Sequence, residues 1–172
     1  PVFEDISFVV EAGDRVALRG PNGCGKSSIL KLLAGHTLEH SGTLLLPQGL
    51  IVSYVPQDAS FLQGGMRDWI RACGVDETLF KAILRKLDFS REHFEQELSE
   101  LSAGQKKKVL IARSLAQQAH LYLWDEPLNY VDVDSRLQIE ELLLRYAPPM
   151  VFVEHDEVFC QKVANRMVFL GK

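Results

Sequence analysis

The sequence has few cysteines and no long apolar run. Its 172 residues include three cysteines, Cys24, Cys73 and Cys160, which are scattered without the spacing of a metal site. An odd number of cysteines, without a secretion signal, favours a reducing, cytoplasmic environment. No apolar run approaches the roughly 20 residues that a membrane-spanning helix needs, so we expect no direct membrane insertion.

The chain has no excess of positive charge. The chain has 19 Lys and Arg against 23 Asp and Glu, for a formal net charge of −4. This balance argues against a strongly basic nucleic-acid-binding face over the whole domain and leaves local patches open. A hydrophobic content of 47% is sufficient for one domain with a real core. Because the first residue is Pro1 and not Met, we expect a fragment of a longer protein.

A phosphate-binding pattern is present near the start. Residues 20–27 read GPNGCGKS and match G-x-x-x-x-G-K-[ST] at every fixed position. An apolar stretch leads into this loop and a helical pattern leads out, so backbone amides and a helix N-terminus are predicted to converge on an anion. Lys26 is expected to reach the β- and γ-phosphates, and Ser27 to hold Mg²⁺. The expected phosphate-binding residues are Gly20, Pro21, Asn22, Gly23, Cys24, Gly25, Lys26, Ser27 and Ser28.

Hydrophobic patterning predicts strands that alternate with helices. The expected strands are 7–10, 15–19, 43–46, 50–54, 121–124, 150–153 and 167–170. The expected helices are one ending near 34 and those at 66–73, 76–87, 102–116, 135–146 and 157–164. The alternation predicts an α/β fold with a mostly parallel sheet flanked by helices. We expect one domain with a core at 1–57 and 119–172 and an inserted α-helical subdomain at about 58–118.

Two acids follow a buried-strand pattern. Asp125 and Glu126 come directly after the apolar segment 121–124, and ligands of a parallel sheet bind at the carboxyl ends of its strands. We expect Asp125 to meet the Mg²⁺ held by Ser27, and Glu126 to reach the water that attacks the γ-phosphate. Taken alone, the pair also fits an exposed acidic turn that is helped by Pro127.

A second motif restricts the class of nucleotide-binding protein. Residues 101–105 read LSAGQ, and Ser102 is expected to cap a helix whose free N–H groups suit a phosphate. Given this order of motifs, the chain resembles the nucleotide-binding domain of an ATP-binding-cassette (ABC) protein, whose signature is LSGGQ. The resemblance implies a P-loop NTPase fold with an antiparallel β edge and Mg²⁺-dependent hydrolysis of ATP to ADP and phosphate. The implied signature residues, which contact a partner's ATP, are Leu101, Ser102, Ala103, Gly104 and Gln105.

The resemblance implies roles for further residues. Gln57 resembles the Q-loop glutamine, which contacts Mg²⁺ or the lytic water, and His155 resembles the switch histidine that bonds the γ-phosphate. Taken alone, Gln57 fits a surface loop and His155 a structural histidine. Asp132 resembles the D-loop aspartate at a dimer interface. The implied catalytic residues are Glu126, His155 and Gln57, and the implied metal ligands are Ser27, Gln57 and Asp125.

The other candidate side chains have no implied role in the chemistry. The adenine-stacking aromatic of the family precedes the first strand, where this chain has only Phe3, which also fits a core position. The three lysines at 106–108 are expected to form a solvated helix face. Four histidines are expected to be solvated: His36, His40, His93 and His120.

Two branches of the ABC family remain open. In ABC proteins the signature helix of one domain closes on the nucleotide of another, so the partner is a second cassette, either in the same parent chain or in a homodimer. Residues 126–132 read EPLNYVD, similar to the EPTNHLD of ABC-F proteins rather than the EPTSALD of transporters. The short helical block and lysines 106–108 resemble the second, C-terminal cassette of ABC-F proteins of the antibiotic-resistance type. We therefore expect a ribosome partner through the parent protein, with a membrane permease as the alternative.

Two more distant classes fit less well. ATPases of chromosome maintenance or repair separate the two halves of the domain with a long coiled coil, and no heptad run occurs between 58 and 100. A cassette that only binds nucleotide is disfavoured because Lys26, Asp125, Glu126 and His155 are all present.

Overall fold

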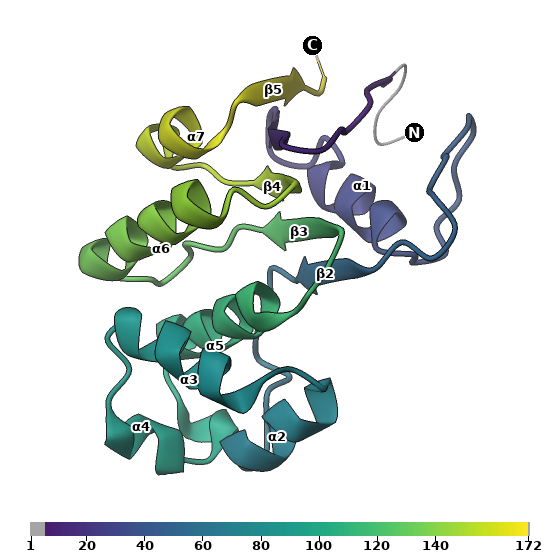
Figure 1. The fold of residues 1–172 in the computed structure, drawn as a ribbon. Coiled ribbons are helices and arrows are strands. Elements are labelled where there is room, and N and C mark those ends of the chain that lie inside the picture. The colour runs from purple at the N-terminus through teal and green to yellow at the C-terminus, as the bar shows by residue number, and fades with distance from the viewer. Residues whose placement is uncertain (1–5, 172) are drawn as a thin grey trace.

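The computed structural model describes residues 6–171, which form a five-stranded sheet with helices on both faces (Figure 1). The strand order is β2–β3–β4–β1–β5, and every strand pair in the described residues is parallel. The strands are β1 (Arg15–Arg19), β2 (Val52–Val55), β3 (Leu121–Asp125), β4 (Met150–Val153) and β5 (Arg166–Phe169). All strand carboxyl ends therefore meet at one edge of the sheet.

The helices begin and end close to the predicted positions. They are α1 (Lys26–Leu33), α2 (Met66–Cys73), α3 (Glu77–Lys86), α4 (Arg91–Glu95), α5 (Ala103–Ala116), α6 (Val133–Tyr146) and α7 (Glu157–Val163). The Asp76 side chain accepts the Leu79 amide and caps α3 as predicted. Gly35 follows α1 with a φ of 93°, the left-handed conformation expected of a helix stop. Helix α4 and a 3₁₀ turn at Leu98–Glu100 were not predicted, since both are shorter than two turns.

The sheet is buried on both faces. In β1, Val16 and Leu18 pack in a cluster with Ile29 and Leu30 of α1. Ala17 points to the opposite face, into the larger cluster that contains buried side chains of α5, α6 and α7. Every residue of β3 and β4 is buried, as the continuous apolar runs of a doubly covered parallel sheet require.

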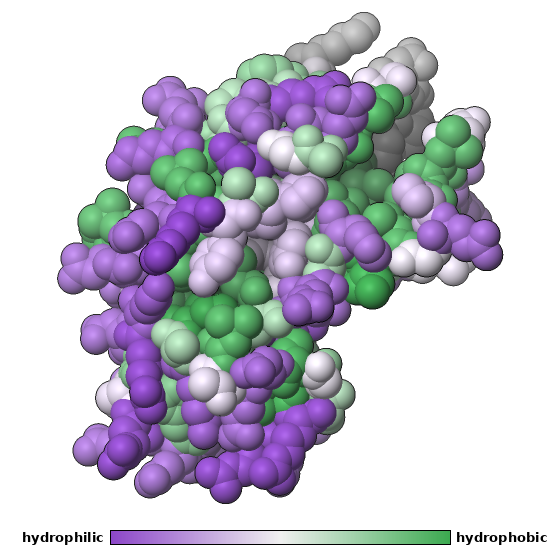
Figure 2. Space-filling model, viewed as in Figure 1, coloured by the Kyte–Doolittle hydropathy of each residue, from purple (hydrophilic) through white to green (hydrophobic). Residues whose placement is uncertain are grey.

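The predicted antiparallel edge is absent from the described residues, because neither 7–10 nor 43–46 forms a strand. A strand needs a neighbouring backbone to pair with, and the Val9 carbonyl instead accepts a bond from the Arg166 side chain. Residues 36–50 form an arm that projects away from the sheet (Figure 1), on which Leu45 is 86% exposed. Figure 2 shows hydrophobic residues at the tip of this arm.

Helices α2 to α5 lie together beside the β2 edge of the sheet (Figure 1). Helix α5 is attached to the sheet by buried polar contacts. Its Ser114 hydroxyl lies 2.7 Å from the Ser53 hydroxyl of β2 and accepts the Trp124 indole N–H of β3 at 2.9 Å. Its Arg113 donates to the Tyr54 carbonyl at 2.8 Å. Within residues 6–171, no helix has both the length and the apolarity to cross a membrane.

Candidate functional site

Four of the predicted site segments follow four different strands. The phosphate loop comes after β1, Gln57 after β2, Glu126 after β3 and His155 after β4. Because these strands are parallel, their following loops converge at one edge of the sheet. Segments that are distant in the sequence are thus brought together by the strand order.

The Glu126 carboxylate is the meeting point of these segments. Its Oε2 accepts Gln57 Nε2 at 2.8 Å and Asn129 Nδ2 at 2.8 Å, and its Oε1 lies 2.7 Å from His155 Nε2. Its backbone amide donates to the Val153 carbonyl at 2.8 Å, and its φ of 48° is unusual for a residue with a side chain. The fold therefore holds this carboxylate between the loops that follow β2 and β4.

The phosphate loop has the geometry of an anion site. Gly25 precedes α1 with a φ of 101°, and no side chain caps the helix, so backbone N–H groups at its N-terminus remain for a ligand. At Gly20, a Cβ atom would lie 2.4 Å from the Leu170 carbonyl oxygen, so this position requires glycine. Lys26 is buried, and its Nζ donates to the Gly20 carbonyl at 2.6 Å and the Pro21 carbonyl at 3.0 Å.

A hollow of about 320 Å³ opens beside this loop. It is lined by residues of β1, β5, the N-terminus of α1 and the loops after β1 and β4: Leu18, Arg19, Gly20, Lys26, Glu154, His155 and Phe169. Neither Glu126 nor the LSAGQ segment lines it. The predicted phosphate-binding lysine and the predicted switch histidine therefore face the same space.

The residues beside the loop fit a hard divalent cation. Asp125 is 1% exposed, and its Oδ1 has no hydrogen-bond partner among the described residues. Burial raises the pKa of Asp125, and hydrogen bonding with the Ser27 side chain opposes that rise. No group of three or more His, Cys, Asp and Glu side chains in residues 6–171 is arranged to hold a metal ion. A cation here would therefore also need the Ser27 hydroxyl or the Gln57 amide oxygen.

The signature segment and the D-loop contact each other within the chain. The Ser102 hydroxyl accepts the Gln105 amide, and the Gln105 side chain accepts the Ser102 amide, a reciprocal capping box at the start of α5. A Cβ on Gly104 would lie 2.2 Å from the Tyr130 carbonyl oxygen, so the helix and the D-loop approach at backbone distance. Lys108 forms a 2.8 Å ion pair with Asp132.

Asp132 also begins the next helix. Its carboxylate accepts the amide and the hydroxyl of Ser135 at the N-terminus of α6. The hydrogen bond from the Lys108 ammonium holds the pKa of Asp132 well below its usual range. The predicted interface residue is therefore a helix cap and an ion-pair partner inside this chain.

The prediction of a solvated lysine face on α5 is wrong for two of its three lysines. Lys107 is 2% exposed and Lys108 is 7% exposed. Lys107 Nζ donates to the Pro56 carbonyl at 3.0 Å and the Asp125 carbonyl at 3.3 Å. Burial lowers the pKa of Lys107, and the charges of Asp125 and other nearby carboxylates oppose this. Helical spacing was the available signal, because Lys107 shares a face with the buried Ile111.

Glu154 is a polar residue of the site that the sequence interpretation missed. It is 5% exposed, and its carboxylate accepts the Leu128 amide at 3.1 Å and the His155 amide at 3.0 Å. Burial raises the pKa of Glu154, and these backbone bonds oppose the rise. It ties the segment after Glu126 to the predicted switch histidine.

Two histidines predicted to be solvated have specific partners. His93 Nδ1 accepts the Ser90 amide, and its Nε2 lies 3.1 Å from the Gln105 amide nitrogen. His120 Nδ1 accepts the Ile51 amide at 2.9 Å. The bond between His93 and Ser90 is part of a local capping box at the start of α4, whereas the contacts of His93 with Gln105 and of His120 with Ile51 depend on the tertiary structure. Phe3, the alternative adenine stacker, lies outside the described residues.

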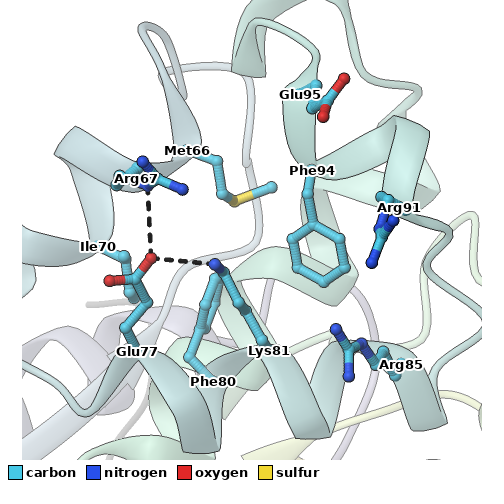
Figure 3. A pocket seen from close by; sticks show the side chains of 10 residues that line it. All are labelled: Met66, Arg67, Ile70, Glu77, Phe80, Lys81, Arg85, Arg91, Phe94 and Glu95. Carbon is cyan, nitrogen blue, oxygen red and sulfur yellow. Dashed lines mark ion pairs between the residues drawn. The ribbon is translucent and has the colours of Figure 1, made fainter.

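A second cavity lies between α2, α3 and α4 and has a volume of about 330 Å³. Figure 3 shows Arg67 and Lys81 directed toward Glu77, with Phe94 and Arg85 on the opposite side. These helices carry none of the predicted phosphate, metal or catalytic residues. The chemistry at the sheet edge, and not cavity size, therefore identifies the candidate site.

Comparison with known proteins agrees with this geometry. Residues 3–129 match the family model described as ABC transporter. The chain is 32% identical over 178 residues to the ATP-binding protein Uup of Caulobacter vibrioides, covering 98% of the chain and 29% of that protein. It is 29% identical over 173 residues to ABC transporter F family member 2 of Arabidopsis thaliana, covering 97% of the chain and 26% of that protein.

Solved structures share the fold. A chain in the crystal structure of archaeal ribosomal stalk protein aP1 with the archaeal ribosome recycling factor aABCE1 superposes with a TM-score of 0.79 at 27% identity, covering 95% of this chain and 33% of that one. A chain described as the ATP binding subunit of an ABC transporter gives 0.82 at 24% identity, covering 98% and 79%.

The match covers most of this chain but only part of its relatives. The chain spans about a quarter to a third of the length of the curated relatives that it matches. The family model covers the phosphate loop, the LSAGQ segment and the acids after β3. The chain belongs to the ABC transporter family and is an ABC ATPase domain of ABC-F type.

Proposed function

We propose that this chain binds Mg²⁺-ATP at the edge formed by the ends of β1 to β4 and hydrolyses it to ADP and phosphate. In this proposal Glu126 accepts a proton from the water that attacks the γ-phosphate. His155 orients that carboxylate and contacts the γ-phosphate, and Gln57 holds the water. Lys26 and the free amides of the phosphate loop neutralise charge that develops on the phosphates.

One observation carries the proposal most strongly, the convergence of three side chains on Glu126. Gln57 and His155 come from the loops after β2 and β4, Asn129 comes from Glu126's own loop after β3, and all three lie within 2.8 Å of this carboxylate. A carboxylate held by neutral donors and a histidine can receive a proton and pass it on. An ordinary exposed acidic turn does not need such an arrangement.

The buried Oδ1 of Asp125 supports Mg²⁺ as the metal, since this acceptor lies beside Ser27 and has no hydrogen-bond partner within residues 6–171. When bound, Mg²⁺ would draw charge from the phosphate oxygens. Ser27, Gln57 and Asp125 are the residues that would hold it. The test is whether Asp125→Asn weakens Mg²⁺-dependent ATP binding more than Mg²⁺-free binding.

We also propose that a complete site needs a second cassette. The LSAGQ segment does not line the hollow at this chain's own phosphate loop, which supports a role on the nucleotide of a partner. Helices α2 to α5 would then act as the helical subdomain that presents Ser102 and the N-terminus of α5. Closure would exclude water other than the attacking one.

The partner that we favour for the full protein is the ribosome, in an ABC-F protein that acts in translation or antibiotic resistance. The D-loop sequence at 126–132 supports this choice, as does the likeness to a structure described as an archaeal ribosome recycling factor. The alternative is a nucleotide-binding domain of a membrane transporter, supported by the fold shared with a transporter's ATP binding subunit.

The experiment that tests the ATPase proposal is Glu126→Gln in the full protein. This change keeps an acceptor oxygen for Gln57 and Asn129 but removes the proton acceptor, so we expect turnover to fall by about a hundredfold or more while ATP binding is retained. Phosphate release and nucleotide binding should be measured on the same sample. Glu141→Gln, at an exposed position of α6, is the matched control and should behave like the unsubstituted protein. Normal turnover in Glu126→Gln would show that Glu126 is not the catalytic base.

The same variant separates the two partner classes. With ATP bound but not hydrolysed, the full protein is expected to cosediment with ribosomes and not with membranes. ATP-dependent retention on membranes with no ribosome binding would favour the transporter alternative.

A further inference from the structure

Lys107 is a buried cation that no step of the proposed hydrolysis uses. It belongs to α5, two residues beyond the LSAGQ segment, and is 2% exposed. Burying an ammonium is unfavourable unless several acceptors surround it, so Lys107 is expected to have hydrogen-bond partners in the interior. Both hydrogen bonds of the Lys107 ammonium are donated to backbone carbonyls at the candidate site.

The two carbonyls belong to the residues just before two proposed catalytic side chains. Lys107 Nζ donates to the Pro56 carbonyl at 3.0 Å, in the peptide that leads into Gln57. It donates at 3.3 Å to the Asp125 carbonyl, in the peptide that leads into Glu126. The Gln57 and Glu126 side chains are themselves joined at 2.8 Å. The Lys107 ammonium therefore links the two peptides that precede Gln57 and Glu126.

The charges around Lys107 also support a role at the candidate site. Four carboxylates oppose the lowering of the Lys107 pKa by burial through their charge: Asp125 at the end of β3, Glu126 after it, Glu154 after β4 and Asp58 after β2. No side-chain ion pair of Lys107 occurs among the described residues, so its charge is shared across the site and not held by one acid. A cation in that place lowers the energy of a site that crowds acidic groups together.

We propose that Lys107 is a positioning residue, which couples the signature helix α5 to the peptides that carry Gln57 and Glu126. Movement of α5 then shifts the two peptides together, because a single ammonium bonds both. The inference rests on the proposed ATPase function, and in it Lys107 acts through the peptides that carry Gln57 and Glu126.

The test compares three lysine variants in the full protein. Lys107→Met keeps the length of the side chain but removes both donors and the charge. Lys107→Gln keeps a donor amide but removes the charge. Lys106→Met is the matched control, because Lys106 is partly exposed and its side chain forms no hydrogen bond or ion pair within residues 6–171.

We expect Lys107→Met to lower kcat by about ten- to a hundredfold, the range seen when a supporting residue is lost, with KM for ATP changed by less than about twofold. Lys107→Gln should recover part of kcat, since its amide can still bond one carbonyl. Lys106→Met should match the unsubstituted protein. ATP binding, measured separately, confirms that each variant is folded.

Two results would overturn the proposal. The first is a kcat for Lys107→Met within twofold of the unsubstituted protein while Glu126→Gln is inactive, which would leave the ATPase function standing. The second is a Lys107→Gln variant that is fully folded and binds ATP yet is no more active than Lys107→Met, which would exclude positioning through these hydrogen bonds. Failure of the ATPase function itself would show differently, as normal turnover in Glu126→Gln.

Discussion

Single residues in this chain are constrained by backbone contacts as much as by side-chain chemistry. Gly104 is the clearest case, since it lies within the signature segment and its α-carbon faces the Tyr130 carbonyl. Tyr130 has a φ of 66°, so the D-loop backbone there is already in an unfavourable conformation. A side chain is therefore excluded at position 104, whereas Tyr130 keeps its side chain and adopts a strained backbone conformation.

Gly104→Ala is therefore expected to destabilise the chain by about 1–3 kcal/mol, because the new Cβ would meet the Tyr130 carbonyl oxygen at 2.2 Å. Urea denaturation measures the change. Ala103→Ser adds one heavy atom at the neighbouring exposed position and should stay within about 0.5 kcal/mol. Equal stability of the two variants would mean that the close approach does not exist in solution.

The Lys108–Asp132 ion pair predicts a pH dependence of stability. Lys108 lowers the pKa of Asp132 in the folded chain, so the stabilisation is complete above the unfolded pKa of about 3.9 and is lost as pH falls below it. Asp132→Asn keeps a helix cap but removes the charge, and should reduce stability at pH 7 by about 0.5–1 kcal/mol.

Unfolding of both forms between pH 3 and 7 checks this prediction. The stability gap between the unsubstituted chain and Asp132→Asn should narrow toward pH 3. Asp134→Asn, an exposed position in the same helix turn, should show a much smaller gap. A gap that is constant with pH would rule out the ion pair as its source.

At the scale of elements, α5 is the helix on which the site and the sheet both depend. Its N-terminus carries the signature segment, its middle carries Lys107, and its C-terminal half bonds β2 and β3 through Arg113 and Ser114. Ser114 lies between the Ser53 hydroxyl and the Trp124 indole, and all three side chains are fully buried. Buried polar groups of this kind specify one docking geometry if each is satisfied.

Ser114→Ala should thus destabilise the chain by about 2 kcal/mol or more, since it leaves two buried partners without a bond. Ser53→Ala should cost about 1 kcal/mol, because the bond between Ser114 and Trp124 persists. Urea denaturation monitored by tryptophan fluorescence reports both. The idea of a shared network fails if Ser53→Ala is as damaging as Ser114→Ala.

At the scale of the whole molecule, the proposed site is divided between two cassettes. The catalytic cluster around Glu126 and the capped N-terminus of α5 are separate parts of one chain. Of these two parts, only His155 of the catalytic cluster lines the hollow at the phosphate loop. A second cassette would supply the missing half of the site, the signature segment at the N-terminus of its own α5.

Mixing two inactive variants tests this division. Glu126→Gln lacks the proton acceptor, and Ser102→Arg blocks the signature segment with a bulky side chain. If sites are shared between copies, mixed dimers contain one intact site, and an equal mixture should regain on the order of a quarter of the unsubstituted ATPase rate. A mixture that is no more active than its components would contradict sharing between copies of this cassette.

Much of this protein follows from sequence alone. The glycines, Lys26 and Ser27 define a phosphate loop, because few residue types allow that backbone and that chemistry. The alternation of apolar runs and helical patterns determined the parallel core and the bounds of most helices. The predicted antiparallel edge is absent from residues 6–171, since pairing depends on a neighbouring strand and not on the apolar pattern of 43–46.

Only the tertiary structure decided how the motifs meet. Strand order brings Gln57 and His155 onto Glu126, and packing buries Lys107 where charge alone predicted a solvated face. Local pattern encodes which groups a segment carries and which face it buries. The partner of each buried polar group depends on elements that are distant in the chain, because its hydrogen bonds join different helices, strands and loops.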